Sequence, residues 1–159
     1  MWLSRIAFLA LLLLAGCGFQ LRGAASVPPE MARTFIETGD RHSIFYRKLA
    51  RSLRGSGVEL VDTPGNATAV LSIMSDDTGQ RVLSVSARNV PREFEVYYAV
   101  VYQVQTPDRT LMPAREQILT RDYTWDETQV LGKEKEEALL REAIADDLVR
   151  IVMIQLSSI

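Results

Sequence analysis

The clearest pattern in the chain is an alternation of apolar and mixed side chains between residues 93 and 106. Successive side chains of a strand point to opposite faces of its sheet, so this period of two predicts a β-strand. One set of alternate positions is apolar or aromatic and should pack against helices: Phe94, Val96, Tyr98, Val100, Tyr102 and Val104. The other set is too polar for a core and too aromatic for plain solvent: Glu95, Tyr97, Ala99, Val101, Gln103 and Gln105.

Two segments repeat their apolar residues at helical spacing. The first, residues 43–54, ends before Gly55 and Gly57, which favour a helix C-terminus. The second, residues 133–156, has an apolar stripe with charged residues on its other faces. The stripe consists of Leu140, Ile144, Leu148, Ile151 and Val152. Both segments are therefore expected to be amphipathic helices.

Further extended segments complete the predicted fold. We expect a strand over residues 31–38 and another that begins at residue 69, is interrupted at 76–79 and continues over 80–86. A turn is expected at 88–92, and a last strand over 116–125. Strands and helices in this order predict a two-layer α/β (α+β) sandwich, with two helices on one face of an about four-stranded mixed or antiparallel sheet. The helices leave the mixed sheet face open, which predicts a partner surface that includes Glu95, Tyr97, Val101 and Gln103.

The N-terminus has the pattern of a secretory signal. Arg5 precedes an unbroken apolar run, residues 6–14, which is shorter than the roughly 20 residues that a transmembrane helix needs. The segment 14–17, Leu-Ala-Gly-Cys, resembles the bacterial lipobox, and Cys17 is the only cysteine of the chain. We therefore expect a signal peptide at 1–16, a lipidated lead-in at 17–30 that begins at an acylated Cys17, and a single domain at 31–159.

Composition excludes several classes of protein. A net charge of −2 over 159 residues provides no global basic field for nucleic acid. One cysteine and one histidine cannot form a structural zinc site. Nucleotide-binding glycine motifs and hydrolase nucleophile motifs are absent, and His42 next to Ser43 does not by itself make a catalytic triad. The sequence therefore predicts a protein that is not an enzyme and uses no metal or cofactor.

The start of the predicted mature chain carries a family resemblance. Residues 17–23, Cys-Gly-Phe-Gln-Leu-Arg-Gly, resemble the first residues of the LPS-assembly lipoproteins of the LptE family. The similarity continues through a Val-Pro lead-in at 27–28, the segments 37–40 and 57–60, and the order of strands and helices. The resemblance implies an outer-membrane lipoprotein that plugs the lumen of the β-barrel LptD in a one-to-one complex, assists its assembly and binds lipopolysaccharide. Gly18, where an aspartate would signal inner-membrane retention, agrees with this location.

The resemblance also implies candidate lipopolysaccharide contacts. Local alignment of the family's basic residues falls on Arg88 and Lys133, and Arg88 lies with Arg81 and Arg92 in one predicted hairpin. Arginine and lysine at a loop tip can form charge-assisted hydrogen bonds with the phosphates of lipid A. The alternative is that Arg88, Arg92 and Lys133 are ordinary solvated surface residues.

Two other functions stay open at this point. The protein could serve as an accessory lipoprotein of another envelope transport or barrel-assembly machine, since a lipid anchor and an open sheet face would suit that role as well. A lipid-anchored hydrolase is disfavoured because no nucleophile motif is present.

Overall fold

The structure of the protein is a computed structural model that describes residues 27–124 and 130–159, with the side chains of 130–133 outside the description. The expected signal peptide and Cys17 also lie outside the described residues. The strands are β1 (Arg33–Thr38), β2 (Glu59–Leu60), β3 (Ala69–Val85), β4 (Pro91–Gln105) and β5 (Thr110–Thr124). The helices are α2 (Ile44–Gly55) and α3 (Val130–Leu156), and two single-turn 3-10 helices are η1 (Pro29–Met31) and η2 (Pro64–Asn66).

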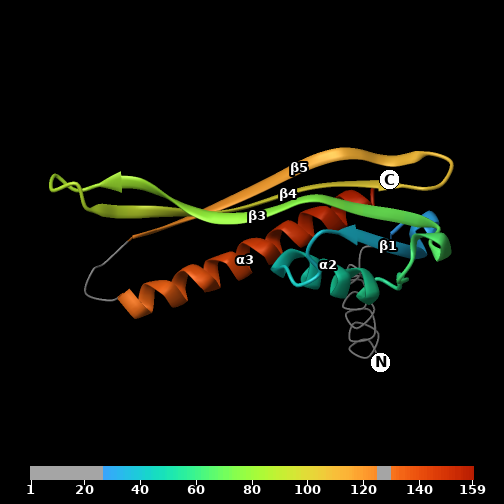
Figure 1. The fold of residues 1–159 in the computed structure, drawn as a ribbon, viewed down its shortest axis with the longest axis horizontal. Helices are drawn as coiled ribbons and strands as arrows, with labels where there is room; N and C mark the ends of the chain where they lie inside the picture. Colours follow the sequence, from blue (N-terminus) through green and yellow to red (C-terminus); the bar gives the residue numbers. More distant parts are fainter. Residues whose placement is uncertain (1–26, 125–129) are drawn as a thin grey trace, which may run out of the picture.

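The five strands form one mixed sheet in the order β2-β1-β3-β4-β5. β1 runs parallel to both β2 and β3, whereas β3, β4 and β5 pair as antiparallel hairpins. Both helices lie against the same face of the sheet (Figure 1). The predicted two-layer sandwich is therefore confirmed. The additional strand is β2, a two-residue segment for which the sequence indicates only a brief extended piece.

The core lies between the helices and the apolar side of β4. Val96, Tyr98, Val100, Tyr102 and Val104 are each at most 1% exposed, which confirms the facing predicted from the alternation. The helices contribute the buried side chains Phe45, Leu49, Leu53, Ile144, Leu148, Val152 and Leu156. Full burial of each large apolar side chain contributes about 1.5–3 kcal/mol relative to exposure.

β3 differs from its prediction because it runs without a break through residues 76–79. Ile73 pairs with Tyr102 and Ser75 pairs with Val101, so Met74 is the extra residue of a β-bulge. Polar residues can continue the strand here because β4 supplies the backbone hydrogen-bond partners. The bulge also changes which residues face the helices, and it places Asp76 on the helix side of the sheet, opposite Val100.

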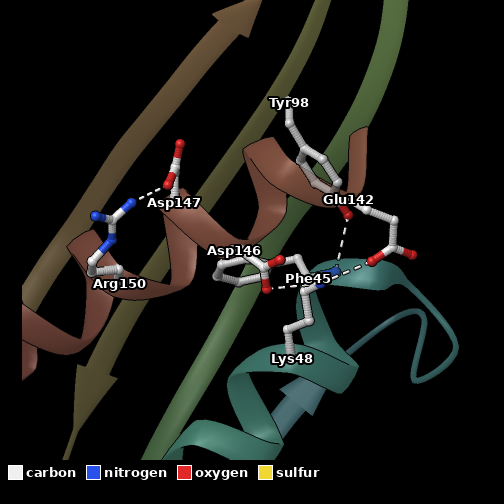
Figure 2. Close-up of polar contacts among 7 residues, drawn as sticks. All are labelled: Phe45, Lys48, Tyr98, Glu142, Asp146, Asp147 and Arg150. Atoms are coloured by element: carbon white, nitrogen blue, oxygen red, sulfur yellow. Dashed lines mark hydrogen bonds and ion pairs between the residues drawn. The ribbon is translucent and has the colours of Figure 1, made fainter. Parts of the chain in front are cut away.

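Asp76 organises the start of α2. The Phe45 backbone N–H donates to Tyr98 Oη at 3.1 Å, and Tyr98 Oη donates to Asp76 Oδ1 at 2.8 Å. Ser43 Oγ donates to Asp76 Oδ2 at 2.5 Å and caps the helix by accepting from the Tyr46 N–H at 3.0 Å. Burial, and then the hydrogen bond to Asp76, raise the pKa of Tyr98, so this hydroxyl stays protonated. The network fixes α2 on the sheet, and Figure 2 shows its hydrogen bond between Phe45 and Tyr98.

A second set of polar contacts joins α2 to α3. Lys48 Nζ lies 2.8 Å from Glu142 Oε2 and 2.7 Å from Asp146 Oδ1 (Figure 2). Burial lowers the pKa of Lys48, but the hydrogen bonds and charges of the two carboxylates outweigh it and leave this pKa raised. The two helices are thus fixed to each other as well as to the sheet.

Candidate functional site

The predicted partner residues lie together on the sheet face turned away from α2 and α3, here named the outer face. Glu95, Tyr97, Val101 and Gln103 are all half-buried, and they occupy alternate positions of β4, the strand between β3 and β5. Their side chains are shielded by neighbours on the adjacent strands of the same face. No helix of the described residues covers this side of the sheet (Figure 1).

Two pairs of polar groups on the outer face contact each other. The Arg81 guanidinium forms an ion pair with the Glu95 carboxylate, and Tyr97 Oη donates to Asp77 Oδ2 at 3.2 Å. The hydrogen bond to Asp77, together with its charge, raises the pKa of Tyr97. Burying a charge or polar group costs most when it lacks a partner. The outer face can therefore be covered by another molecule without leaving these groups unsatisfied.

Tyr97 lies flat across the sheet because its neighbour on β3 is a glycine. A Cβ built on Gly79 would lie 2.8 Å from Tyr97 Oη and 3.0 Å from its ring carbons. Farther along the face, Ala99 pairs with Ile118 of β5, whose side chain is 53% exposed. Together with Val101 these residues form an apolar strip. Ile118 was not among the predicted partner residues, although the alternation along β5 places it on this face.

The two predicted arginines lie at the β3–β4 hairpin, which extends past the helices at one end of the molecule (Figure 1). Ser86 N–H donates to Val90 O at 2.7 Å and closes the turn, and Asn89 has a positive φ of 61°, which asparagine tolerates. Arg88 lies in this turn and Arg92 lies near the start of β4; both are exposed. Arg81 does not belong to this basic tip because Glu95 neutralises it.

Exposed aliphatic side chains accompany the arginines. Val82, Leu83 and Val85 are 48%, 47% and 52% exposed. Sequence reasoning missed them, because a run of apolar residues in a strand is expected to be buried. The end of the hairpin projects beyond the helices (Figure 1), whereas Phe94 at its base still packs against the core. Basic and aliphatic surfaces therefore meet at the same tip.

The remaining predicted site residues are placed only in part. Lys133 belongs to the first turns of α3 by its backbone, and its side chain lies outside the described residues. The start of α3 lies at the same end of the molecule as the basic tip (Figure 1). Cys17 lies outside the described residues.

Other chemistry finds little support in the described residues. Over 27–124 and 130–159, no group of His, Asp and Glu side chains is arranged to hold a metal ion. His42 is exposed, and Ser43 Oγ donates to Asp76 and thereby serves the helix cap. In the same ranges, no helix combines the length and apolarity needed to cross a membrane.

Comparisons with known proteins agree with this architecture. The family model LptE, described as lipopolysaccharide-assembly, matches residues 31–156. An LPS-assembly lipoprotein LptE of Yersinia enterocolitica is 33% identical over 139 residues, which are 87% of this chain and 67% of the relative. The protein of the same name from Yersinia pestis is 27% identical over 158 residues, covering 99% of this chain and 76% of the relative.

A solved structure agrees as well. The solution structure of an uncharacterized lipoprotein B from Nitrosomonas europaea superposes with a TM-score of 0.73 at 27% identity, over 89% of this chain and 91% of that one. The family is one of assembly lipoproteins without enzymatic activity, in agreement with the prediction from the sequence. With its family model matched from the first core residue to the end of α3, the chain belongs to the LptE family.

Proposed function

We propose that this protein is a lipid-anchored outer-membrane component of lipopolysaccharide assembly, which plugs the β-barrel LptD, assists its assembly and binds lipopolysaccharide. The observation that carries the proposal is the outer face, a sheet surface with half-buried positions along β4 and an internal Arg81–Glu95 ion pair, which no described helix covers. The relatives of this protein are named LPS-assembly lipoproteins, which supports a role in lipopolysaccharide assembly.

The outer face suits a large and permanent partner. The apolar strip of Tyr97, Ala99, Val101 and Ile118 supplies the apolar centre that stable protein interfaces contain. Satisfied polar pairs beside it, such as Arg81 with Glu95, lower the cost of removing water. A barrel wall that covers this face would bury both at once.

The basic tip suits lipopolysaccharide. Arg88 and Arg92 are exposed cations that can donate charge-assisted hydrogen bonds to lipid A phosphates. Val82, Leu83 and Val85 are beside them and can contact acyl chains. Lys133 is the third candidate cation, from the start of α3. The tip thus offers both kinds of contact that an anionic glycolipid requires.

The anchor in this proposal is Cys17. Each buried methylene of an acyl chain contributes about 0.8 kcal/mol, so two or three chains would hold the protein on the membrane almost permanently. Acylation would also remove the only thiol of the chain.

Purification of the native lipidated protein from membranes tests the proposal. We expect a one-to-one complex with an outer-membrane β-barrel, together with an intact mass that includes acyl chains on Cys17. Recovery with an inner-membrane ATPase would contradict the plug and favour an accessory role in another envelope machine. An unmodified Cys17 would contradict the anchor.

The double substitution Arg88→Asp/Arg92→Asp tests the basic tip. Loss of hydrogen bonds to charged groups, at about 1.5–3 kcal/mol each, predicts at least a tenfold loss of lipopolysaccharide affinity, while the barrel complex stays intact. Affinity is measured by titration of the purified complex. The matched control is Arg33→Asp/Arg115→Asp, which reverses two exposed arginines away from the tip. Equal affinity of the two double variants would place the lipopolysaccharide site elsewhere.

A further inference from the structure

The solvent side of α2 carries an uncompensated stripe of arginines. Arg47, Arg51 and Arg54 are spaced by four and three residues, so they lie on one face of the helix, and all three are exposed. We name them the basic α2 face. The helix contains no acidic residue. In the part of the chain that the structure describes, Lys48 makes the two ion pairs from α2 to α3, and no ion pair includes these three arginines.

This stripe is unusual for a chain whose net charge is −2. The apolar side chains of α2, among them Phe45, Leu49 and Leu53, are buried against the sheet. The basic α2 face therefore has no apolar centre. Protein interfaces bury apolar and aromatic groups at their centres, whereas a purely charged, solvated stripe suits a flat anionic surface.

The start of the described chain lies beside this helix. Glu59 N–H donates to Ala32 O at 2.9 Å, and Val58 N–H donates to Leu53 O at 3.1 Å, so the lead-in reaches the domain next to the C-terminal end of α2. Cys17 precedes Val27 by ten residues, which span at most about 33–36 Å. α2 itself is about 18 Å long, at 1.5 Å per residue. An anchor at Cys17 would thus keep α2 within reach of the membrane that holds the anchor.

We propose that the basic α2 face docks on the anionic phosphate headgroups of the leaflet into which the acyl chains of Cys17 insert. The inference rests on the proposed anchor and adds an orientation to it. The tether supplies a high local concentration of headgroups, and the arginines select the side of the domain that faces them. The outer face is on the opposite side of the sheet from α2 (Figure 1), so this docking describes the anchored protein before it enters the barrel and leaves the outer face exposed to meet it.

Energy transfer in reconstituted vesicles tests this docking. A donor fluorophore is attached through Gly55→Cys, a position where a Cβ meets no atom within 4 Å, and acylated Cys17 leaves no other thiol. Acceptors are placed on lipid headgroups, in vesicles of phosphatidylcholine alone or mixed with phosphatidylglycerol. We expect stronger transfer in the anionic vesicles and its decline at high salt.

The variant Arg47→Gln/Arg51→Gln/Arg54→Gln should lower the ratio of docked to undocked protein roughly a hundredfold, at about a factor of five for each arginine near an anionic surface. The matched control Arg33→Gln/Arg109→Gln/Arg115→Gln removes the same charge elsewhere and should dock normally. Equal transfer in the two kinds of vesicle, or equal docking of the two variants, would overturn the proposal.

Three further outcomes have defined meanings. Release of the labelled protein from neutral vesicles would refute the anchor itself and so the proposed function, whereas retention without docking refutes only this inference. Inorganic phosphate that undocks the protein from anionic vesicles far more than chloride does at equal ionic strength would also overturn the inference. It would indicate a discrete anion-binding site. The third outcome is a triple variant Arg47→Gln/Arg51→Gln/Arg54→Gln that docks as the wild type does but co-purifies with less barrel. That result would overturn the membrane docking and indicate that the basic α2 face binds an acidic protein surface.

Discussion

At the scale of single residues, two tyrosines on adjacent positions of β4 have opposite roles. Tyr98 is 1% exposed, and its hydroxyl links the first turn of α2 to Asp76. Tyr97 points to the outer face, where its ring covers Gly79 and its hydroxyl contacts Asp77. The strand alternation predicted this division correctly. It could not predict the hydroxyl partners, because Asp76 faces the helices only as a result of the bulge at Met74.

The substitution Tyr98→Phe tests the buried link. It removes the acceptor of the Phe45 N–H and one donor to Asp76, and an unsatisfied buried group costs about 1–3 kcal/mol. We expect a loss of that size in the free energy of unfolding, measured by urea denaturation, with faster amide exchange at the start of α2. Tyr97→Phe is the control and should change stability by less than about 0.5 kcal/mol. Equal costs for the two substitutions would contradict the assigned roles.

At the scale of elements, charged side chains connect α3 to the sheet and to α2. Asp147 of α3 accepts from Arg121 Nη2 of β5 at 2.5 Å and also pairs with Arg150, as Lys48 pairs with Glu142 and Asp146 (Figure 2). The hydrogen bond from Arg121, followed by the charge of Arg150, lowers the pKa of Asp147 below its ordinary 3.8. A group whose pKa is lowered by folding stabilises the fold above its unfolded pKa.

Acid dependence tests this contact. The contribution of Asp147 should be complete above pH 3.8 and disappear as the pH falls through its lowered folded pKa. Asp147→Asn should therefore reduce the free energy of unfolding at neutral pH by up to about 1 kcal/mol, and the difference from wild type should vanish in strong acid. Urea denaturation across this range measures it, with Asp108→Asn in an exposed turn as control. A difference that grows in acid would contradict the pairing.

The elements also show what the sequence could and could not predict. The helix over 43–54 and the strand facing of β4 were predicted correctly, because their periodicity depends on the local chain alone. The predicted break of the strand at 76–79 was wrong, and so was the predicted start of β5 at residue 116, since β5 starts at Thr110. In both places backbone pairing with β4 overrides local composition. Pairing with a distant strand is also what turns Glu59–Leu60 into β2.

At the scale of the whole molecule, the two layers separate two surfaces. The outer face combines an apolar strip with the Arg81–Glu95 ion pair, and the opposite side presents the basic α2 face. The basic tip lies at one end, beyond the helices (Figure 1). The candidate partner residues were predictable from the sequence because they share one strand. The aliphatic residues of the tip were not, since their exposure depends on where the helices end.

The central claim is that another protein covers the outer face, and photo-cross-linking from Val101 tests it most directly. A photoreactive residue at Val101 of the lipidated protein should yield one major product with an outer-membrane β-barrel, because this half-buried position belongs to the apolar strip. The same residue at Arg54, on the other side of the sheet, should yield that product far less. Free monomer from Val101, or equal cross-linking from both positions, would contradict the account.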